Sequence, residues 1–328
     1  MSVLLDEYTA AALSGDRATA AELATDFAGR DESCLRVVTQ LLAPSQRNVG
    51  ERWLRGECTV AEEHSATFVT ESVLSSLAVG LETQEHVGTV VMVCAEGELH
   101  SLPARMATEL MTANGWRVIH LGSAMPAGKL RYYLAEIGAD VVGVSVTLAT
   151  NLPGAARTVR AARQAGYSVI CGGRAFDSSG ARARSIGAHG QPGELTTEPL
   201  VLDDIFWGEP VAVNMDADWA HLDFHRVQVV RDALSWLGTG DFADRVRSAT
   251  WLAQFAEDLD DIVAAGAAAM LCGDRTIVLE QRTWLEQRLA AVGTPVEVAR
   301  HSFDAVAAVV DKRVPGASAL FSWPIERE

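Results

Sequence analysis

Four short apolar runs in the middle of the chain decide the fold: VGTVVMVCA (87–95), WRVIHLG (116–122), DVVGVSVT (140–147) and YSVICGG (167–173). β-Branched residues are frequent in them, and they end at glycine or polar residues, which is typical of buried strands. Helical stretches lie between them, at 103–114, 128–137 and 153–164. Strands that alternate with helices at this interval predict parallel βαβ units in a doubly wound sheet, an α/β fold.

The segments on both sides of this region are predicted to be helical. Apolar residues recur at helical spacing from Leu35 to Leu42, and residues 61–81 contain few helix breakers. After the α/β region, apolar residues repeat every three or four positions at 227–237, 241–266, 275–291 and 297–310. We therefore expect three domains: an N-terminal helical bundle (1–84), a parallel-sheet domain (85–200) and a C-terminal all-α helical domain (201–328).

Composition and charge exclude several classes of protein. The 328 residues are 48% hydrophobic and 21% charged, which is ordinary for a globular protein. A net charge of -16 disfavours binding to nucleic acid. The purest apolar run, 141–149, is shorter than the ~18 residues that a membrane span needs. The N-terminus lacks the basic start of a signal peptide, so a cytoplasmic location is expected.

Two further observations concern chemistry. The five cysteines are scattered and set mostly among apolar neighbours, which predicts buried thiols in a reducing compartment rather than disulfides or a zinc site. The sequence contains no HExxH motif, no phosphate-binding glycine loop and no recognisable catalytic triad, so we do not expect the chain itself to be an enzyme.

The loop after the first predicted strand reads EGELHSLP (96–103) and carries Glu98 and His100. Doubly wound sheets bind ligands at the carboxyl ends of their strands, which is where this loop lies. An imidazole can bind a metal through one nitrogen while a carboxylate holds its other N–H. The alternative is that His100 only caps the helix that begins near Pro103.

Small and polar residues end two of the other strands. Ser145, Val146 and Thr147 end the third strand, and Gly172 and Gly173 end the fourth. Small hydroxyl side chains beside a glycine pair would leave a narrow polar slot at the sheet edge. Alternatively, the glycine pair forms only a strand-to-helix turn.

Together these residues resemble the cobalamin-binding domain family over residues 87–190. The resemblance implies that His100 replaces the cofactor's own nucleotide base as the lower axial ligand of cobalt, and that Glu98 accepts a hydrogen bond from it. The implied slot for the displaced nucleotide tail, and the cofactor-binding set around it, comprises Ser101, Leu102, Ser145, Val146, Thr147, Gly172 and Gly173. Pro103 stands where the family usually has glycine.

In the N-terminal bundle, Trp53 is followed nine residues later by Glu63 and His64. By composition alone, this is a core tryptophan and a surface pair. It also resembles the signature of the helical cap in cobalamin photoreceptors, the family of CarH-type repressors. That resemblance implies that Trp53 shields the adenosyl group and that Glu63 and His64 contact the upper ligand.

Two departures from that family limit what the resemblance implies. Leu54 stands where CarH-type proteins have a histidine that binds cobalt after illumination. The chain also starts directly with the cap, whereas those repressors start with a DNA-binding domain, so DNA binding is not expected.

The C-terminal region is rich in aromatic residues, which are core residues by default. However, the order of cap, α/β domain and helical domain resembles photocobilins, which bind biliverdin beside the corrinoid. That resemblance implies bilin contacts from Trp219, His221, His225 and Arg226, with individual roles unassigned.

The function expected from these resemblances is light sensing. Adenosylcobalamin bound between cap and α/β domain would lose its adenosyl group in light, which would change conformation or oligomeric state. Expected partners are further copies of the chain in a light-dependent homo-oligomer and a downstream protein. One alternative is a corrinoid protein that shuttles methyl groups between methyltransferases. Another is an α/β interaction module without a corrinoid.

Overall fold

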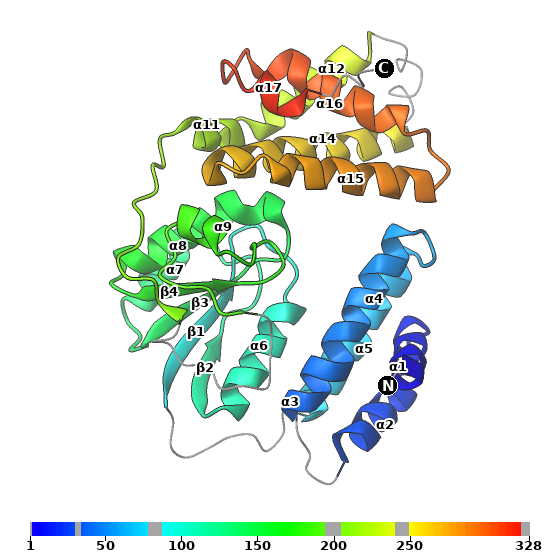
Figure 1. Cartoon of the computed structure of the whole chain (residues 1–328), viewed down its shortest axis with the longest axis vertical. Helices are drawn as coiled ribbons and strands as arrows, with labels where there is room; N and C mark the ends of the chain where they lie inside the picture. The colour runs from blue at the N-terminus through cyan, green and yellow to red at the C-terminus, as the bar shows by residue number, and fades with distance from the viewer. Residues whose placement is uncertain (1, 30–33, 78–86, 194–204, 240–248, 323–328) are drawn as a thin grey trace.

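The computed structural model describes residues 2–29, 34–77, 87–193, 205–239 and 249–322 (Figure 1). An N-terminal group of helices comprises α1 (Ser2–Leu13), α2 (Arg17–Ala28), α3 (Cys34–Val37), the π-helical turn η2 (Val38–Leu42), α4 (Ala43–Leu54) and α5 (Val60–Leu77). The predicted domain boundaries at 84/85 and 200/201 lie outside the described residues, as does the predicted helical stretch 241–248.

Strands and helices alternate in the next part of the chain, as predicted. They are β1 (Gly88–Cys94), α6 (Leu102–Ala113), β2 (Trp116–His120), α7 (Ala127–Leu134), β3 (Val141–Ser145), the 3-10 turn η3 (Ala149–Asn151), α8 (Leu152–Gln164), β4 (Ser168–Gly172) and α9 (Ala181–Ser185).

The four strands form one parallel sheet in the order β2-β1-β3-β4. All residues of β3 are buried, which explains its continuous apolar sequence. The register pairs Cys94 with Ser145 and Ser145 with Gly172, so the last residues of β1, β3 and β4 lie at the same edge. The predicted doubly wound α/β fold is confirmed, and its register brings the three loops that follow these strands together.

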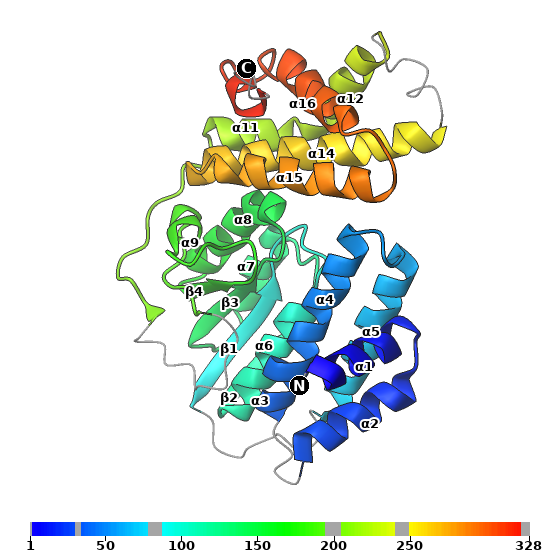
Figure 2. The same ribbon diagram turned by 45° about the vertical axis from the view of Figure 1, so that its right-hand side comes forward.

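Helices cover both faces of the sheet. On one face, α6 contributes Leu102, Met106 and Leu110 to the hydrophobic core of the N-terminal helices, which we call the cap. On the other face, α7 and α8 pack together against the sheet. Thus α6 is the element through which the cap is attached to the α/β domain (Figure 2).

The C-terminal part is helical. Its elements are α11 (Asp218–Phe224), α12 (Arg226–Leu237), α14 (Ala249–Cys272), α15 (Thr276–Ala291), α16 (Glu297–Val310) and α17 (Ser318–Phe321). Helix α14 packs against η3 and α8, and the buried residues of these helices are continuous with the α7–α8 side of the sheet. The C-terminal domain therefore lies over the loop edge of the α/β domain (Figures 1 and 2).

In the C-terminal part, one predicted helix end is wrong. Residues 241–266 were expected to form a helix that ends at Gly266, but α14 continues to Cys272. A Cβ atom at Gly266 would lie 2.2 Å from Cζ of Phe321. This glycine makes room for an aromatic ring that packs on the helix, so it does not end the helix.

Four of the five cysteines have described side chains, and all four are free thiols. Cys94 and Cys171 are buried, whereas Cys58 and Cys272 are partly exposed. Among the described helices, none combines the length and the apolar character that a membrane span requires.

Candidate functional site

The β1 loop brings Glu98 and His100 into direct contact. Nδ1 of His100 lies 2.5 Å from Oε1 of Glu98, and the backbone N–H of His100 donates to the same oxygen at 2.9 Å. Burial raises the pKa of the Glu98 carboxyl, but hydrogen bonds from His100 and from the Thr147 N–H outweigh it and lower this pKa to about 2. Glu98 is therefore ionised at neutral pH and can only accept, so Nδ1 carries the proton.

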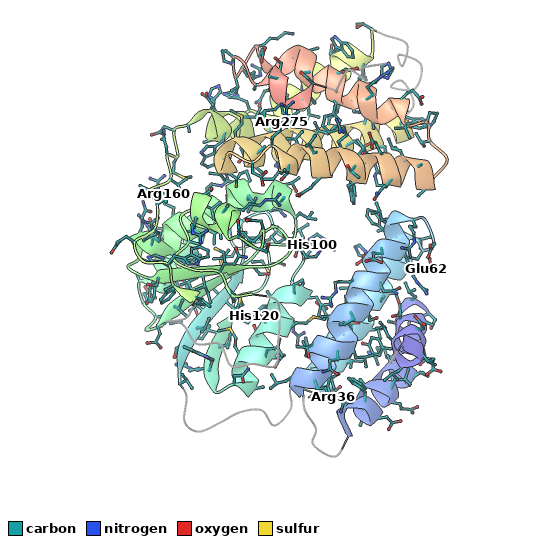
Figure 3. All side chains as sticks on the ribbon, viewed as in Figure 1. Arg36, Glu62, His100, His120, Arg160 and Arg275 are labelled. Carbon is teal, nitrogen blue, oxygen red and sulfur yellow. The ribbon has the colours of Figure 1, made fainter. Side chains whose placement is uncertain are left out.

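This tautomer leaves Nε2 of His100 with its lone pair free. The imidazole is half exposed, whereas Glu98 is fully buried. The hydrogen bond to Glu98 raises the pKa of His100, with a further contribution from the charge of Glu63 on α5. His100 is thus an oriented imidazole that presents Nε2 at the surface of the α/β domain, on the side facing α4, α5 and α15 (Figure 3).

Glu98 also joins the β1 loop to the β3 loop. Its Oε2 accepts hydrogen bonds from the backbone N–H groups of Thr147 at 2.7 Å and Leu148 at 3.2 Å, and from Nδ2 of Asn151 at 3.1 Å. Asn151 could not be predicted from the sequence, because its contact with Glu98 depends on two loops about 50 residues apart meeting at the sheet edge.

The predicted slot residues lie at the ends of β3 and β4. Ser145 and Val146 are buried, and Oγ1 of Thr147 is buried without a hydrogen-bond partner among the described residues. A Cβ at Gly172 would meet only Cγ of Pro192, at 3.6 Å, so this glycine leaves space beside it.

Gly173 has a different role. Its φ is +118°, and a Cβ there would lie 2.1 Å from the carbonyl oxygen of Val146. The glycine is needed because the backbone after β4 passes close to that after β3. For Gly173, this agrees with the alternative that the glycine pair forms a strand-to-helix turn.

Ser101 and Leu102 connect the site to the cap. Oγ of Ser101 donates to Oε1 of Glu71 at 3.4 Å, and Leu102 is buried in the core that α6 shares with the cap. Nδ1 of His64, whose side chain is largely exposed, lies 2.7 Å from Oε2 of Glu63, and Oγ1 of Thr67 donates to Oε1 of Glu63 at 3.0 Å.

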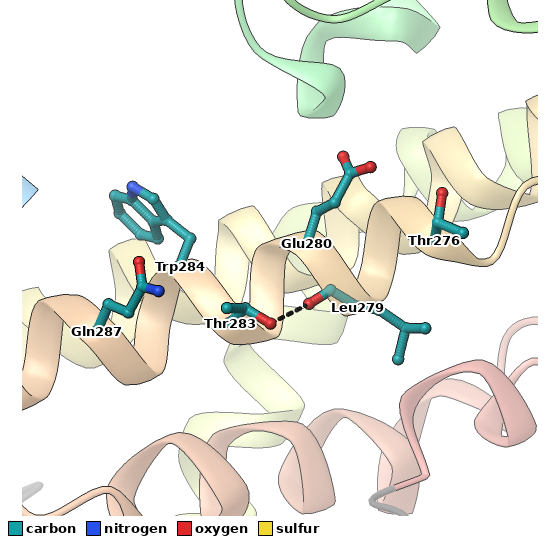
Figure 4. A pocket seen from close by; sticks show the side chains of 6 residues that line it. All are labelled: Thr276, Leu279, Glu280, Thr283, Trp284 and Gln287. Atoms are coloured by element: carbon teal, nitrogen blue, oxygen red, sulfur yellow. Dashed lines mark hydrogen bonds between the residues drawn. The ribbon is translucent and has the colours of Figure 1, made fainter. Parts of the chain in front are cut away.

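Trp53 lies near the end of α4 and contacts the C-terminal domain. Its ring centroid is 5.9 Å from that of Trp284 on α15, with an angle of 34° between the planes. Trp284 also lines an open depression of about 390 Å³ along α15, together with Glu280 and Gln287 (Figure 4). Trp284 is one of the C-terminal aromatic residues that are core residues by default, and nothing in the sequence pairs it with Trp53.

A pocket of about 210 Å³ connects His100 to the C-terminal domain. One wall is formed by the β1 and β3 loops and the other by α12 and α14; the lining residues are Gly97, Glu98, Leu99, His100, Leu148, Thr150, Asn151, Arg226, Asp260, Asp261 and Ala264. We call this space the His100 pocket. Most of its lining residues are polar or charged.

The four residues for which bilin contacts were expected occupy different environments. Arg226 lines the His100 pocket. Trp219 is buried in the core, where its Nε1 donates to the carbonyl of Asn214 at 3.0 Å. The rings of His221 and His225 lie 4.4 Å apart, with His221 exposed and His225 half-buried.

Comparison with known proteins agrees with the geometry. Residues 88–201 match one family model described as a B12 binding domain, and residues 4–78 match a second model with the same description. A corrinoid protein of Desulfitobacterium hafniense is 28% identical over 157 residues, which are 45% of this chain and 71% of that protein.

A second relative is the HTH-type transcriptional repressor CarH of Myxococcus xanthus. It is 32% identical over 165 residues, and the match covers 49% of this chain and about half (54%) of the repressor. Among solved structures, the monomethylamine corrinoid protein of Methanosarcina barkeri has a TM-score of 0.51 at 18% identity, covering 60% of this chain and 94% of that one. At that identity the likeness shows the fold alone.

The residues present fit a corrinoid. His100 offers a free Nε2 in a fixed tautomer, Thr147 has a buried hydroxyl without a partner among the described residues, and Gly172 puts no side chain at the end of β4. Nitrogen donors of this kind suit cobalt, and the carboxylate behind the imidazole is the usual support of a metal-binding histidine. With B12 binding domain matches on both its cap and its α/β domain, the chain is a cobalamin-binding protein.

Proposed function

We propose that the chain is a light sensor that binds adenosylcobalamin between its cap and its α/β domain. His100 would bind cobalt from below, and Trp53, with Glu63 and His64, would cover the upper face. When bound, adenosylcobalamin would supply a cobalt–carbon bond that green or blue light breaks. One relative, 32% identical over 165 residues, is a CarH repressor. The cap residues Trp53, Glu63 and His64 resemble the same family, which supports this function.

The observation that carries the proposal is the contact between Trp53 and Trp284. Trp53, which in this proposal would cover the upper ligand, contacts Trp284 of the C-terminal domain, so a change in the packing beneath Trp53 would reach α15 directly. A ligand shifts a conformational equilibrium only through contacts that differ between two states. In this proposal, Trp53 makes such a contact.

A second connection runs from the His100 loop to the C-terminal domain through ion pairs. Arg157 on α8 bonds Glu96 on the β1 loop at 2.5 Å and Asp223 on α11 at 2.6 Å. Arg226 on α12 then bonds Asp223 at 3.6 Å and Asp260 on α14 at 2.9 Å. We propose that movement of the loop or the cap changes how the C-terminal domain packs, with a change of oligomeric state or partner binding as the output.

Biliverdin as a second chromophore is a separate part of the proposal. Its support is the C-terminal helical domain and the presence of Arg226, a cation suited to a propionate, in the His100 pocket. Adding biliverdin to the purified chain and recording its visible spectrum tests this part. An unchanged biliverdin spectrum would contradict it without affecting the corrinoid part.

The light response is tested on the full chain loaded with adenosylcobalamin in the dark. Green light is expected to change both the visible spectrum and the elution volume in size-exclusion chromatography. Trp284→Ala should keep the spectral change and lose most of the change in elution volume. Trp236→Ala, which removes an exposed indole elsewhere in the domain, is the matched control and should behave as wild type. An unchanged spectrum and size after illumination would refute the sensor function.

The methyl-shuttle alternative is favoured by the corrinoid proteins among the relatives. It predicts tighter binding of methylcobalamin than of adenosylcobalamin, and methyl transfer to a thiol acceptor in the presence of a methyltransferase. That result, together with no response to light, would favour the shuttle over the sensor.

A further inference from the structure

The His100 pocket contains one carboxylate that the site described so far does not use. Asp261 lies on α14, on the wall opposite the β1 loop, beside Asp260 and one turn before Ala264. Its side chain is half-buried. A residue of the C-terminal domain therefore shares a small space with the imidazole that would bind cobalt.

Among the residues that the structure describes, Asp261 has no hydrogen-bond or ion-pair partner, in contrast to the charged groups around it. Arg226 is bonded to Asp223 and Asp260, and Asp258 is bonded to Arg288 and Gln254. Within the described part of the chain, Asp261 makes no hydrogen bond and no ion pair. Burial and the charges of Asp260 and Asp258 raise the pKa of its carboxyl to about 6. A partly buried carboxylate without a donor destabilises the fold, and such groups are frequent where a ligand supplies the missing donor.

A corrin centred on Nε2 of His100 would supply such donors. The macrocycle is much wider than an imidazole, so its edge would extend past the ring of His100 towards the neighbouring walls of the pocket. That edge carries primary carboxamides, whose N–H groups donate to carboxylates. A carboxylate on the corrin edge would instead be repelled by Asp261, because Arg226, the cation that lines the same pocket, is already paired with Asp223 and Asp260.

We propose that Asp261 accepts a hydrogen bond from a peripheral carboxamide of the corrinoid, so that α14 forms a wall of the cofactor site and selects amidated corrinoids over their carboxylate derivatives. This inference rests on corrinoid binding and not on the response to light. It gives the C-terminal domain a direct role in recognising the cofactor, in addition to the contact between Trp53 and Trp284.

The test uses the full chain, hydroxocobalamin and the three cobalamin monocarboxylic acids in which one propionamide is a carboxylate. Equilibrium dialysis measures the affinity of wild type, Asp261→Asn and Glu257→Gln for each. Wild type is expected to bind one of the acids at least ~10-fold more weakly than hydroxocobalamin, which is the size of one hydrogen bond to a charged group. Asp261→Asn should bind hydroxocobalamin about 10-fold more weakly than wild type and lose the discrimination between the two.

Glu257→Gln is the matched control, because Glu257 is an exposed carboxylate one turn earlier on the same helix. It should bind all four corrinoids as wild type does. Equal discrimination by wild type and Asp261→Asn would overturn the proposal, and so would no discrimination by wild type.

The melting temperature of the ligand-free protein separates recognition from a structural role. Since Asp261 is unpaired and repelled by its neighbours, Asp261→Asn should keep or raise this temperature. A lower melting temperature, with affinity reduced equally for all four corrinoids, would make Asp261 a structural residue and refute the proposal. If the wild type binds no corrinoid at all, the premise of corrinoid binding fails, and the proposal for Asp261 fails with it. If the protein binds corrinoids but does not respond to light, only the sensor function fails, and these affinities can still be measured.

Discussion

Replacing Glu98 with glutamine should weaken corrinoid binding through His100 while largely preserving the fold. Five donors converge on this buried carboxylate: two from His100, the backbone N–H groups of Thr147 and Leu148, and Nδ2 of Asn151. A glutamine side chain has one acceptor oxygen and one NH₂ group. The NH₂ group must therefore replace one of the two carboxylate oxygens.

The less costly choice places the oxygen towards Thr147, Leu148 and Asn151 and the NH₂ group towards His100. Nδ1 of His100 can then accept from this NH₂ group, but only if the proton moves to Nε2. The backbone N–H of His100 loses its acceptor, which costs about 1–3 kcal/mol. Because a protonated Nε2 has no lone pair for cobalt, corrinoid affinity should fall about 10- to 100-fold.

Urea unfolding of the ligand-free protein and equilibrium dialysis with hydroxocobalamin measure the two effects. His100→Ala is the comparison, since it removes the ligand but leaves Glu98 with four of its five donors, including the backbone N–H of residue 100. Because the side chain of His100 is half exposed, His100→Ala should lose less stability than Glu98→Gln. Its affinity for hydroxocobalamin should fall by a similar factor. Wild-type affinity in Glu98→Gln would refute the argument from the tautomer.

Three further predictions follow from buried groups and close contacts. Arg182→Met should destabilise the chain by about 1–3 kcal/mol in urea unfolding, because Arg182 is only 6% exposed and its loss leaves the buried carbonyl of Ala175 and the carboxylate of Asp274 without this donor. An effect below ~0.5 kcal/mol would contradict this. Gly154→Ala should weaken hydroxocobalamin binding in equilibrium dialysis. A Cβ there would lie 1.9 Å from the carbonyl oxygen of Glu96 and would displace the loop that carries His100. Unchanged affinity would refute this expectation. The pKa of Asp261 is raised in the folded state, so the ligand-free wild type should lose stability as the pH rises from about 4 to about 6, whereas Asp261→Asn should not show this loss. Unfolding free energies that change in parallel for the two proteins over that range would exclude this effect.

The sequence predicted the α/β domain well because its signals are local. Buried parallel strands need uninterrupted β-branched runs, and β3 is such a run with every residue buried. Helix limits were also close: residues 103–114 were expected and α6 is Leu102–Ala113. The expected helix 128–137 was too long, since α7 ends at Leu134 and a turn follows, in which the N–H of Ile137 bonds the carbonyl of Leu134.

The candidate site was only partly readable from the sequence. Glu98 and His100 are two residues apart on one loop, so their contact follows from local geometry. The bonds from Thr147 and Asn151 to Glu98 depend on the register that aligns the ends of β1 and β3. The error at Gly266 has the same origin, because the ring of Phe321 that occupies the space beside it comes from 55 residues later in the chain.

The sequence by itself determined the order of the three domains, the parallel sheet and the loop that carries an imidazole with its carboxylate. These features depend on the periodicity of apolar residues and on the two-residue spacing of Glu98 and His100, which are both local. Only the tertiary structure decided that Trp53 meets Trp284 and that Asp261 and His100 line the same pocket. These arrangements join segments more than 150 residues apart in the chain, and they depend on how whole hydrophobic faces pack together. No local pattern of residues encodes that packing.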